Sequence, residues 1–273
     1  MANTLENWLR AAPLPLPEAR ILLQHCTGLS RAQLLTRGRD ALGGESEAAL
    51  AALVQRRLAG EPMAYIVGVR EFYGRTFIVN DAVLIPRPET EHLVEAALAR
   101  LPPQGRLWDL GTGSGAVAVT VALERPDVHV RASDISADAL AVAARNAASL
   151  GAKLEFAQGS WFAVDRPSEA QAYDVVVSNP PYIEAGDVHL QQGDLRFEPQ
   201  QALTDFSDGL SCLRALAEGA PHVLKAGGWL LLEHGYNQGE AARALLVQHD
   251  FVEVATLPDL AGLDRITLGR KPA

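Results

Sequence analysis

The 273-residue chain has only two cysteines and no lysine-rich insert, and each scarcity excludes a class of protein. Cys26 and Cys212 lie far apart without metal-ligand spacing, so reduced thiols are expected and no metal site. No apolar run is long enough to span a bilayer, and the residues after Met1 do not form a basic and then apolar leader. We therefore expect a cytoplasmic protein with no membrane partner.

Basic residues are the minority, with 24 Lys and Arg against 33 Asp and Glu, which gives a net charge of −9. This balance argues against general binding to phosphate backbones, so nucleic acid is not expected as a partner. The hydrophobic content of 48% and charged content of 21% are typical of globular proteins. The length suits one large domain with a smaller one, and we expect a monomer.

The hydrophobic period changes at Tyr65. Residues 1–62 are predicted to form a small helical bundle that docks a partner, because apolar positions recur there at helical spacing. Residues 63–84 are predicted to be a β-hairpin linker, with strands at 65–68 and 75–80. Residues 85–273 are predicted to form the main domain.

Strands and helices alternate along the main domain. The stretch 116–123 is rich in β-branched residues, yet we predict a helix because two parallel strands need a crossover between them. A helix within 207–224 is expected to end at Gly227-Gly228. The predicted strands are 106–110, 129–133, 153–158, 175–178, 229–233 and an antiparallel pair at 251–256 and 266–269. This order predicts an α/β fold with a doubly wound, mostly parallel sheet.

A glycine-rich loop follows the first strand of this sheet. Its glycines allow the backbone to approach a ligand closely and to turn at φ values that a side chain would forbid. The candidate cofactor-binding residues of the loop are Gly111, Thr112, Gly113, Ser114 and Gly115. Asp134 ends the second strand, where a carboxylate can accept hydrogen bonds from ribose hydroxyls.

The loop alone does not name the cofactor, since Gly111-x-Gly113-x-x-Ala116 also fits a looser dinucleotide fingerprint. Asp109 would repel a pyrophosphate but would attract a cationic amino-acid group, which favours S-adenosylmethionine. Trp161, after the third strand, would lie near the adenine of a cofactor bound at Asp134, or would be a core residue. A nicotinamide-binding dehydrogenase is the alternative from another class.

Asn179-Pro180-Pro181-Tyr182 follows a buried strand, at the strand end where open α/β sheets bind their ligands. The two prolines stiffen the chain, because each fixes φ and lacks an N–H. The Asn179 side-chain oxygen and the Pro180 carbonyl can both accept from a substrate NH2, while the Tyr182 ring stacks on its plane. We therefore predict catalytic roles for Asn179, Pro180 and Tyr182, with Pro181 also in the substrate site.

The chain resembles the peptide-chain release factor glutamine N5-methyltransferases. The motifs that carry this resemblance are Ile85-Pro-Arg-Pro-Glu-Thr-Glu91, Asp109–Gly115, Val177–Ile183, Arg196-Phe-Glu-Pro199, Leu232-Glu-His-Gly235 and Asp259–Arg265. The resemblance implies the class I S-adenosylmethionine-dependent methyltransferase fold, with S-adenosylhomocysteine as product. It implies donor contacts from Gly111–Gly115, Asp134, Trp161 and Asn179. It also implies, as substrate, the glutamine of the Gly-Gly-Gln loop in bacterial class I release factors.

Two other readings share the Asn-Pro-Pro-Tyr motif. An N6-adenine DNA methyltransferase would use the same four residues on a flipped base, but it would need a basic recognition region. A glutamine methylase of another translation protein is the second. A catalytically silent adaptor is a further alternative, which the intact motif disfavours. The roles of Arg87 and Glu89 stay open between structure and site.

Overall fold

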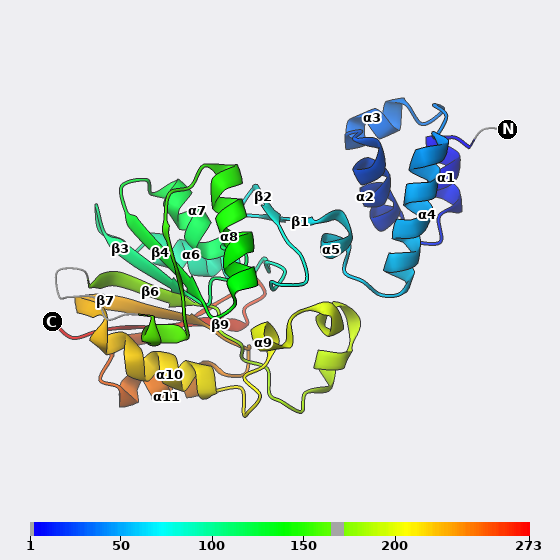
Figure 1. Ribbon diagram of the computed structural model, residues 1–273. Coiled ribbons are helices and arrows are strands. Elements are labelled where there is room, and N and C mark those ends of the chain that lie inside the picture. Colours follow the sequence, from blue (N-terminus) through cyan, green and yellow to red (C-terminus); the bar gives the residue numbers. More distant parts are fainter. Residues whose placement is uncertain (1–2, 165–171) are drawn as a thin grey trace. The chain divides into compact units, whose positions relative to one another are not determined.

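The protein is described from a computed structural model that covers residues 3–164 and 172–273. The chain forms two compact units, Met1–Gly68 and Val69–Ala273 (Figure 1). In the described part of the chain, no helix combines the length and apolar character needed to cross a bilayer.

The smaller unit is helical, as the sequence predicts. Leu22, Leu23 and Leu50 are fully buried at its centre, where the apolar stripes of the helices meet. Ser30 begins one helix with a capping box, because its side chain accepts from the Gln33 N–H while the Gln33 side chain accepts from the Ser30 N–H. The helices are α1 Leu5–Ala11, α2 Leu16–Thr27, α3 Arg31–Thr36, α4 Gly44–Leu58 and α5 Met63–Val67.

The strand expected at residues 65–68 is wrong. These residues belong to α5, which starts after Pro62 and ends at Gly68 in the left-handed conformation. The β-hairpin is instead formed by β1 Val69–Phe72 and β2 Arg75–Ile78, both in the larger unit. β-branched and aromatic residues therefore misled the prediction, because the flanking proline and glycine set a short helix.

The larger unit contains a seven-stranded sheet in the order β5-β4-β3-β6-β7-β9-β8. The first five strands of this order run parallel, and β9 is antiparallel to both β7 and β8. The strands are β3 Arg106–Leu110, β4 His129–Asp134, β5 Glu155–Gln158, β6 Tyr173–Ser178, β7 Leu224–Glu233, β8 Val252–Pro258 and β9 Asp264–Arg270. The predicted doubly wound, mostly parallel sheet is confirmed.

Helices cover both faces of this sheet (Figure 1). One face carries α6 Thr90–Leu98, α7 Ala116–Glu124 and α8 Ala137–Leu150; the other carries α10 Ser211–Gly219 and α11 Gly239–Gln248. Short helical segments lie in the connections: η1 Trp161–Ala163, η3 Val188–Gln191, η4 Gly193–Phe197, α9 Gln200–Leu203 and η5 Ala220–His222. The β-branched stretch that could pass for a strand is α7.

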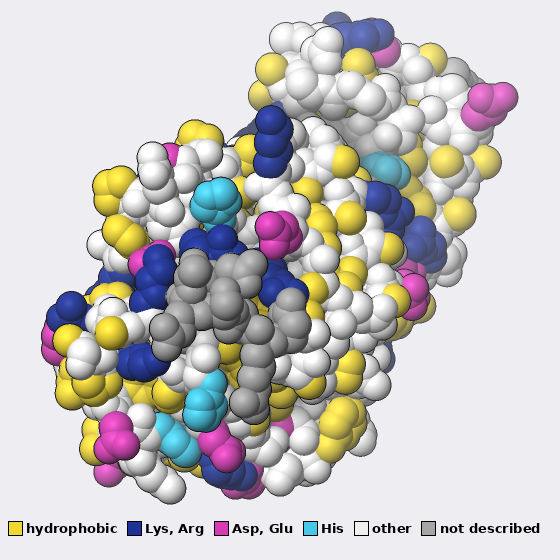
Figure 2. Space-filling view, turned by 60° about the vertical axis from the view of Figure 1, so that its left-hand side comes forward, with side chains coloured by type: hydrophobic (Ala, Val, Ile, Leu, Met, Phe, Trp, Pro, Cys, Tyr) yellow, Lys and Arg dark blue, Asp and Glu magenta, His cyan; other side chains and the backbone are white. Residues whose placement is uncertain are grey.

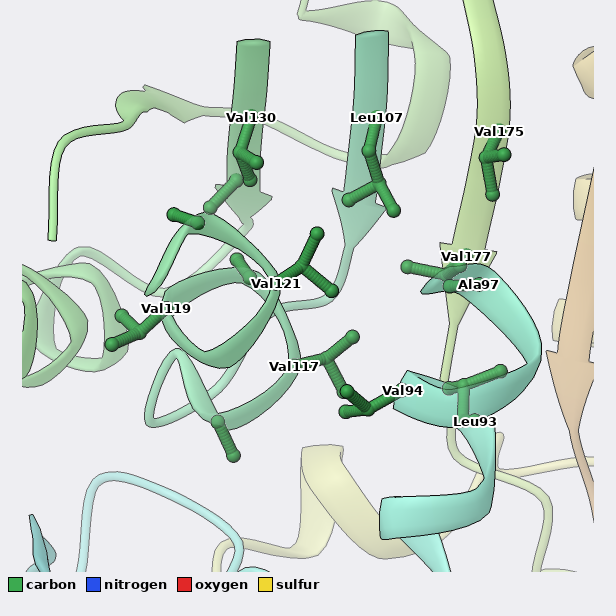
Figure 3. Packing of buried hydrophobic residues seen from close by; sticks show 14 of the residues in the cluster. Leu93, Val94, Ala97, Leu107, Val117, Val119, Val121, Val130, Val175 and Val177 are labelled. Carbon is green, nitrogen blue, oxygen red and sulfur yellow. The ribbon is translucent and has the colours of Figure 1, made fainter. Parts of the chain in front are cut away.

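The core of the first face lies between α6, α7 and the strands. In Figure 3, Val121 of α7 points toward Leu107 of β3, while Val117 faces Val94 of α6. All seven residues Ala116–Ala122 are buried, so burial on every side outweighs the weak helix propensity of the β-branched residues. On the outside of the larger unit, hydrophobic side chains are scattered among polar ones on the face shown in Figure 2.

The predicted end of the helix before β7 is also wrong. α10 ends at Gly219, and Gly227 and Gly228 lie inside β7. Gly227 has a φ of +75°, and the pairing with β6 shifts register between Tyr173 and Val175 at this point. The glycine pair therefore forms an irregularity at the start of a strand, a position where glycine is common.

Candidate active site

A cavity lies at the carboxyl ends of β3, β4 and β6. Parallel strands end at the same edge of a sheet, so residues that are distant in sequence meet there. Its lining includes Ala82–Leu84, Pro86, Arg87, Thr90, Asp109, Gly111–Ser114, Asp134–Ser136, Gly159–Trp161, Asn179, Pro181, Pro199, Gln201 and Ala202, but not Glu89. The structure thus places the predicted glycine loop, Asp134, Trp161 and Asn179 around one space.

The glycine loop is held against β4. The backbone N–H groups of Gly111 and Thr112 both donate to the Ser133 carbonyl at 2.9 Å. Gly111, Gly113 and Gly115 all have positive φ, which explains the glycine spacing. A Cβ on Gly115 would also lie only 3.1 Å from the Ala143 Cβ, so this glycine lets α7 begin close to α8.

Asp134 ends β4 and faces the loop. Its carboxylate accepts from the backbone N–H of Gly113 and of Ser136, each at 2.9 Å. Burial raises the pKa of Asp134, and these backbone N–H groups oppose that rise. A carboxylate has about four lone-pair sites, so two acceptor sites stay available for a ligand beside it.

Asp109 lies beneath the loop and is 2% exposed. Its carboxylate accepts from the Thr112 hydroxyl at 2.7 Å. Burial raises the pKa of Asp109 to about 7, although the Thr112 hydroxyl and the Ala118 N–H favour the ionised form. A buried carboxyl of this kind is stabilised as the anion by a cationic ligand group.

Trp161 is partly buried at the start of η1, with a φ of +44°. Its ring lies over Gly111, where an added Cβ would be 3.4 Å from the ring. The ring also packs against the core of the second sheet face. Trp161 therefore covers the glycine loop and packs against the core, and its contact with an adenine stays a prediction.

Asn179 follows β6 and lines the cavity. Its side-chain Nδ2 donates to the Thr90 hydroxyl at 3.2 Å, and no described residue donates to its Oδ1. The preceding residue, Ser178, donates its hydroxyl to the Leu110 carbonyl at 2.7 Å, which ties the end of β6 to the end of β3. The glycine loop and Asn179 are thereby held at fixed positions.

The other three residues of the Asn179–Tyr182 motif differ in whether they line the cavity. Pro181 lines the cavity, Pro180 is buried, and Tyr182 is partly exposed but is not part of this lining. The carbonyl of Pro180 accepts no hydrogen bond within the described residues. Gln238 fixes the segment by donating to the Tyr182 carbonyl at 3.0 Å. Burial, together with the charge of Glu233, raises the pKa of Tyr182 to about 12.

The sequence interpretation left the role of Arg87 open and did not single out Thr90, Glu198 or Glu233. Arg87 lines the cavity and pairs with Glu198, which also accepts from the Ile85 N–H. Thr90 contacts Asn179, and Glu233 lies buried near Tyr182. All of them fall within motifs that carry the resemblance. That position was a signal, although nothing in the residues themselves indicated a role.

The architecture and the site together define a class of enzyme. In the sheet, β9 lies between β7 and β8 and is antiparallel to both, and a glycine loop, a strand-end carboxylate and an aromatic ring surround the cavity. The residues present fit S-adenosylmethionine, because Asp134 has free acceptor sites and Asp109 is a buried carboxyl next to the same loop. The class is that of the S-adenosylmethionine-dependent methyltransferases.

Comparison with known proteins agrees with this class. The model of the PrmC N-terminal domain matches residues 3–68, and that of the methyltransferase small domain matches residues 89–197. A release factor glutamine methyltransferase from Neisseria gonorrhoeae is 66% identical over 98% of this chain and 97% of its own length. One from Bordetella pertussis is 52% identical over 97% of this chain and 98% of its own.

Solved structures are more distant and show the fold alone. A methyltransferase from Pyrococcus furiosus is 17% identical, with a TM-score of 0.55 over 80% of this chain and 98% of its own.

The chain belongs to the release factor glutamine methyltransferase family. The predicted family, enzyme class and cofactor are confirmed.

Proposed function

We propose that this chain methylates the side-chain amide nitrogen of the glutamine in the Gly-Gly-Gln loop of bacterial class I release factors. Family membership and the cavity support this activity. The observation that carries the site assignment is a pair of acceptors, the Asn179 Oδ1 and the Pro180 carbonyl, that no described residue satisfies. Acceptors in such partly buried positions normally have partners, and a carboxamide NH2 offers two donors.

The donor side of the cavity is assigned to the glycine loop, Asp134, Trp161 and Asp109. Asp134 would bind the ribose hydroxyls with its free acceptor sites. The exposed apolar side chain of Ile135 and the ring of Trp161 would bound the adenine. Asp109, ionised against the cationic amino-acid end, would hold the opposite end of the ligand. S-adenosylmethionine, when bound there, supplies an electrophilic methyl group.

The chain's own contribution is to orient the substrate nitrogen. An amide nitrogen is a weak nucleophile, because its lone pair is delocalised into the carbonyl. Asn179 and Pro180 accept from its two N–H groups, so the lone pair is directed into the cavity and electron density shifts toward nitrogen. Orientation of this kind supplies on the order of 7–11 kcal/mol.

The same two oxygens stabilise positive charge as it develops on nitrogen, which is stronger binding of the transition state than of the ground state. No strong base is needed in this scheme, since the proton becomes acidic once nitrogen is alkylated and can leave to water. Tyr182 does not serve as a base, because its pKa of about 12 keeps it neutral. Its proposed part is apolar contact with the carboxamide plane.

The proposed partner is a protein, and nucleic acid is not part of the proposal. The net charge of −9 supports this choice. Residues 1–62, which include most of the helical unit, are proposed to dock the release factor. The chain is proposed to act as a monomer. Its proposed location is the cytoplasm, where its substrate functions. The boundaries predicted at residues 63–84 and 85–273 differ from the compact units, because the helical unit extends to Gly68 and the hairpin of β1 and β2 belongs to the larger unit.

Asn179→Ala tests the assignment. We expect methyl transfer to a purified release factor to be lost, while S-adenosylhomocysteine still binds in a calorimetric titration. Retention of more than about a tenth of the wild-type kcat, a loss of only ~1.4 kcal/mol in transition-state binding, would contradict the mechanism. Peptide mapping of the labelled product locates the modified residue. Label in DNA, or in a residue other than glutamine, would overturn the proposed substrate.

Asp134→Ala tests the donor side separately. This variant should weaken binding of S-adenosylhomocysteine and leave the site of modification unchanged, because Asp134 has no contact with the substrate amide in this proposal. An unchanged dissociation constant would remove Asp134 from the donor site.

A further inference from the structure

Glu233, the last residue of β7, is a buried acid that the proposed reaction does not use. It is 2% exposed, and its Oε2 has no hydrogen-bond partner within the described residues. Taking a carboxyl group out of water without satisfying it is costly, so such a group in a folded protein calls for a reason.

The sheet places Glu233 next to the substrate side of the cavity. Leu232 pairs with Ser178 in the parallel register of β6 and β7, so Glu233 and Asn179 are the next residues of the two strands. Thr90, the first residue of α6, is 5% exposed and faces both of them. Three elements thus bring an amide, a hydroxyl and a carboxyl group together.

The hydroxyl of Thr90 determines the direction of this arrangement. Its oxygen accepts from the Asn179 Nδ2 at 3.2 Å, so its single hydrogen is available for another acceptor. The Glu233 carboxyl lies near it, and the interaction between the two favours the ionised form of the acid. Donation of this hydrogen to the carboxylate would leave the Thr90 hydroxyl with a single orientation.

We propose that Glu233 is a positioning residue for methyl transfer, which acts through Thr90 to hold the Asn179 amide with its oxygen toward the substrate. The inference rests on the proposed function, since it gives Asn179 the role of substrate acceptor. The order of donors is Asn179 N–H to Thr90, then Thr90 O–H to Glu233.

This relay has two physical consequences for the reaction. First, it selects one of the two amide orientations, because a flipped Asn179 would direct its oxygen at the lone pairs of Thr90. Second, hydrogen bonds in a chain polarise one another, so donation toward a carboxylate makes the Asn179 oxygen a stronger acceptor. Both effects favour the substrate arrangement in which positive charge builds up on the amide nitrogen.

The charge of Glu233 depends on pH near neutrality. Burial raises its pKa to about 7. The charged or titratable groups that act on it are Arg265 from β9, Arg87 and Glu89 before α6, and Tyr182 after β6. Because the ionised form is the better acceptor, wild-type kcat should rise as pH increases through about 7.

The experiment measures kcat and KM with a purified class I release factor and labelled S-adenosylmethionine. Glu233→Gln keeps the shape but removes the charge, and we expect kcat to fall roughly tenfold, because charge-assisted hydrogen bonds are about twice as strong as neutral ones. Thr90→Val removes the hydroxyl and should lower kcat roughly a hundredfold, the effect of misplacing a reacting group by about 1 Å. Thr90→Ser should restore most of it.

Three further readouts separate positioning from a structural role. The Thr90→Val, Glu233→Gln double variant should be no slower than Thr90→Val, because Glu233 acts only through the hydroxyl. The rise of kcat with pH should disappear in Glu233→Gln. Asp174→Asn is the matched control: its carboxylate lies at the opposite end of β6, bonded to Lys225 and the Arg106 N–H, so kcat should not change.

Wild-type kcat in Glu233→Gln, or multiplied losses in the double variant, would overturn the relay. An equal loss in Asp174→Asn would also overturn it, because any buried carboxyl would then have the same effect. Asn179→Ala distinguishes the two levels of inference. If Asn179→Ala is active, the proposed function fails at its mechanism; if it is inactive while Glu233→Gln and Thr90→Val are unimpaired, only the relay fails.

Discussion

The pair of Arg87 and Glu198 offers a measurable test of how the substrate side of the cavity is held. The Glu198 side chain is fully buried and accepts from the Ile85 N–H at 3.0 Å, whereas 30% of the Arg87 side chain is exposed. The two residues join the segment before α6 to the segment before α9, and both segments line the cavity. Removing the arginine would leave a buried anion with one backbone donor.

The size of the effect follows from this asymmetry. Breaking a buried ion pair lowers the free energy of unfolding by about 3–5 kcal/mol. Because Arg87 is partly exposed, we expect Arg87→Met to lose ~3 kcal/mol. Adding Glu198→Gln neutralises the stranded group and should recover about 1–2 kcal/mol of that loss.

Urea unfolding followed by tryptophan fluorescence measures these differences. A Trp8→Phe background removes the tryptophan of the smaller unit, so that Trp108, Trp161 and Trp229 report on the larger unit alone. Arg214→Met is the control, because Arg214 pairs with Asp208 on the surface and should contribute less than about 1 kcal/mol.

A loss of unfolding free energy in Arg87→Met no larger than that in Arg214→Met would contradict the role of the buried pair. A further loss of stability on adding Glu198→Gln to Arg87→Met would also contradict it, since a stranded carboxylate would then not be the source of the loss.

Two further outcomes are expected. Asp109 has its pKa raised to about 7 in the folded chain, so stability should fall as pH rises toward 7, and Asp109→Asn should flatten that dependence in urea unfolding. Gly115→Ala should lower the free energy of unfolding by about 2–4 kcal/mol, because of its positive φ and of overpacking against Ala143. Gly151→Ala, which has a positive φ but open space around it, should lose only about 1 kcal/mol. Equal losses in the two variants would contradict the packing argument.

The sequence predicts the parallel sheet well because its signals are local. Each buried strand is a short apolar run followed by turn residues, and the helix at 116–123 follows from the need for a crossover rather than from propensity. The errors at residues 65–68 and at Gly227-Gly228 have a common cause. Glycine ends a helix in one context and interrupts a strand in another, and only the partner strand decides between them.

Some residues of the candidate site can be predicted from the sequence and others cannot. The glycines at 111–115, Asp134 and Asn179 can be placed at the cavity from the sequence, because each ends or follows a strand and each side chain, or its absence, has an evident use there. Thr90 and Glu233 have uses that depend on one another. Thr90 contacts a residue 89 positions away, and the proposed direction of its hydrogen bond depends on an acid on a third element.

A residue that acts by orienting another residue produces no recognisable motif at its own position in the sequence. A threonine at the start of a helix indicates a cap, and a glutamate at the end of an apolar strand indicates a surface group. Neither general tendency holds here, because Glu89 rather than Thr90 is the N-cap of α6 and Glu233 is nearly inaccessible. Such conflicts between a local rule and the observed burial occur mostly at functional sites. They therefore point to the residues that fix Asn179, which composition and spacing leave unassigned.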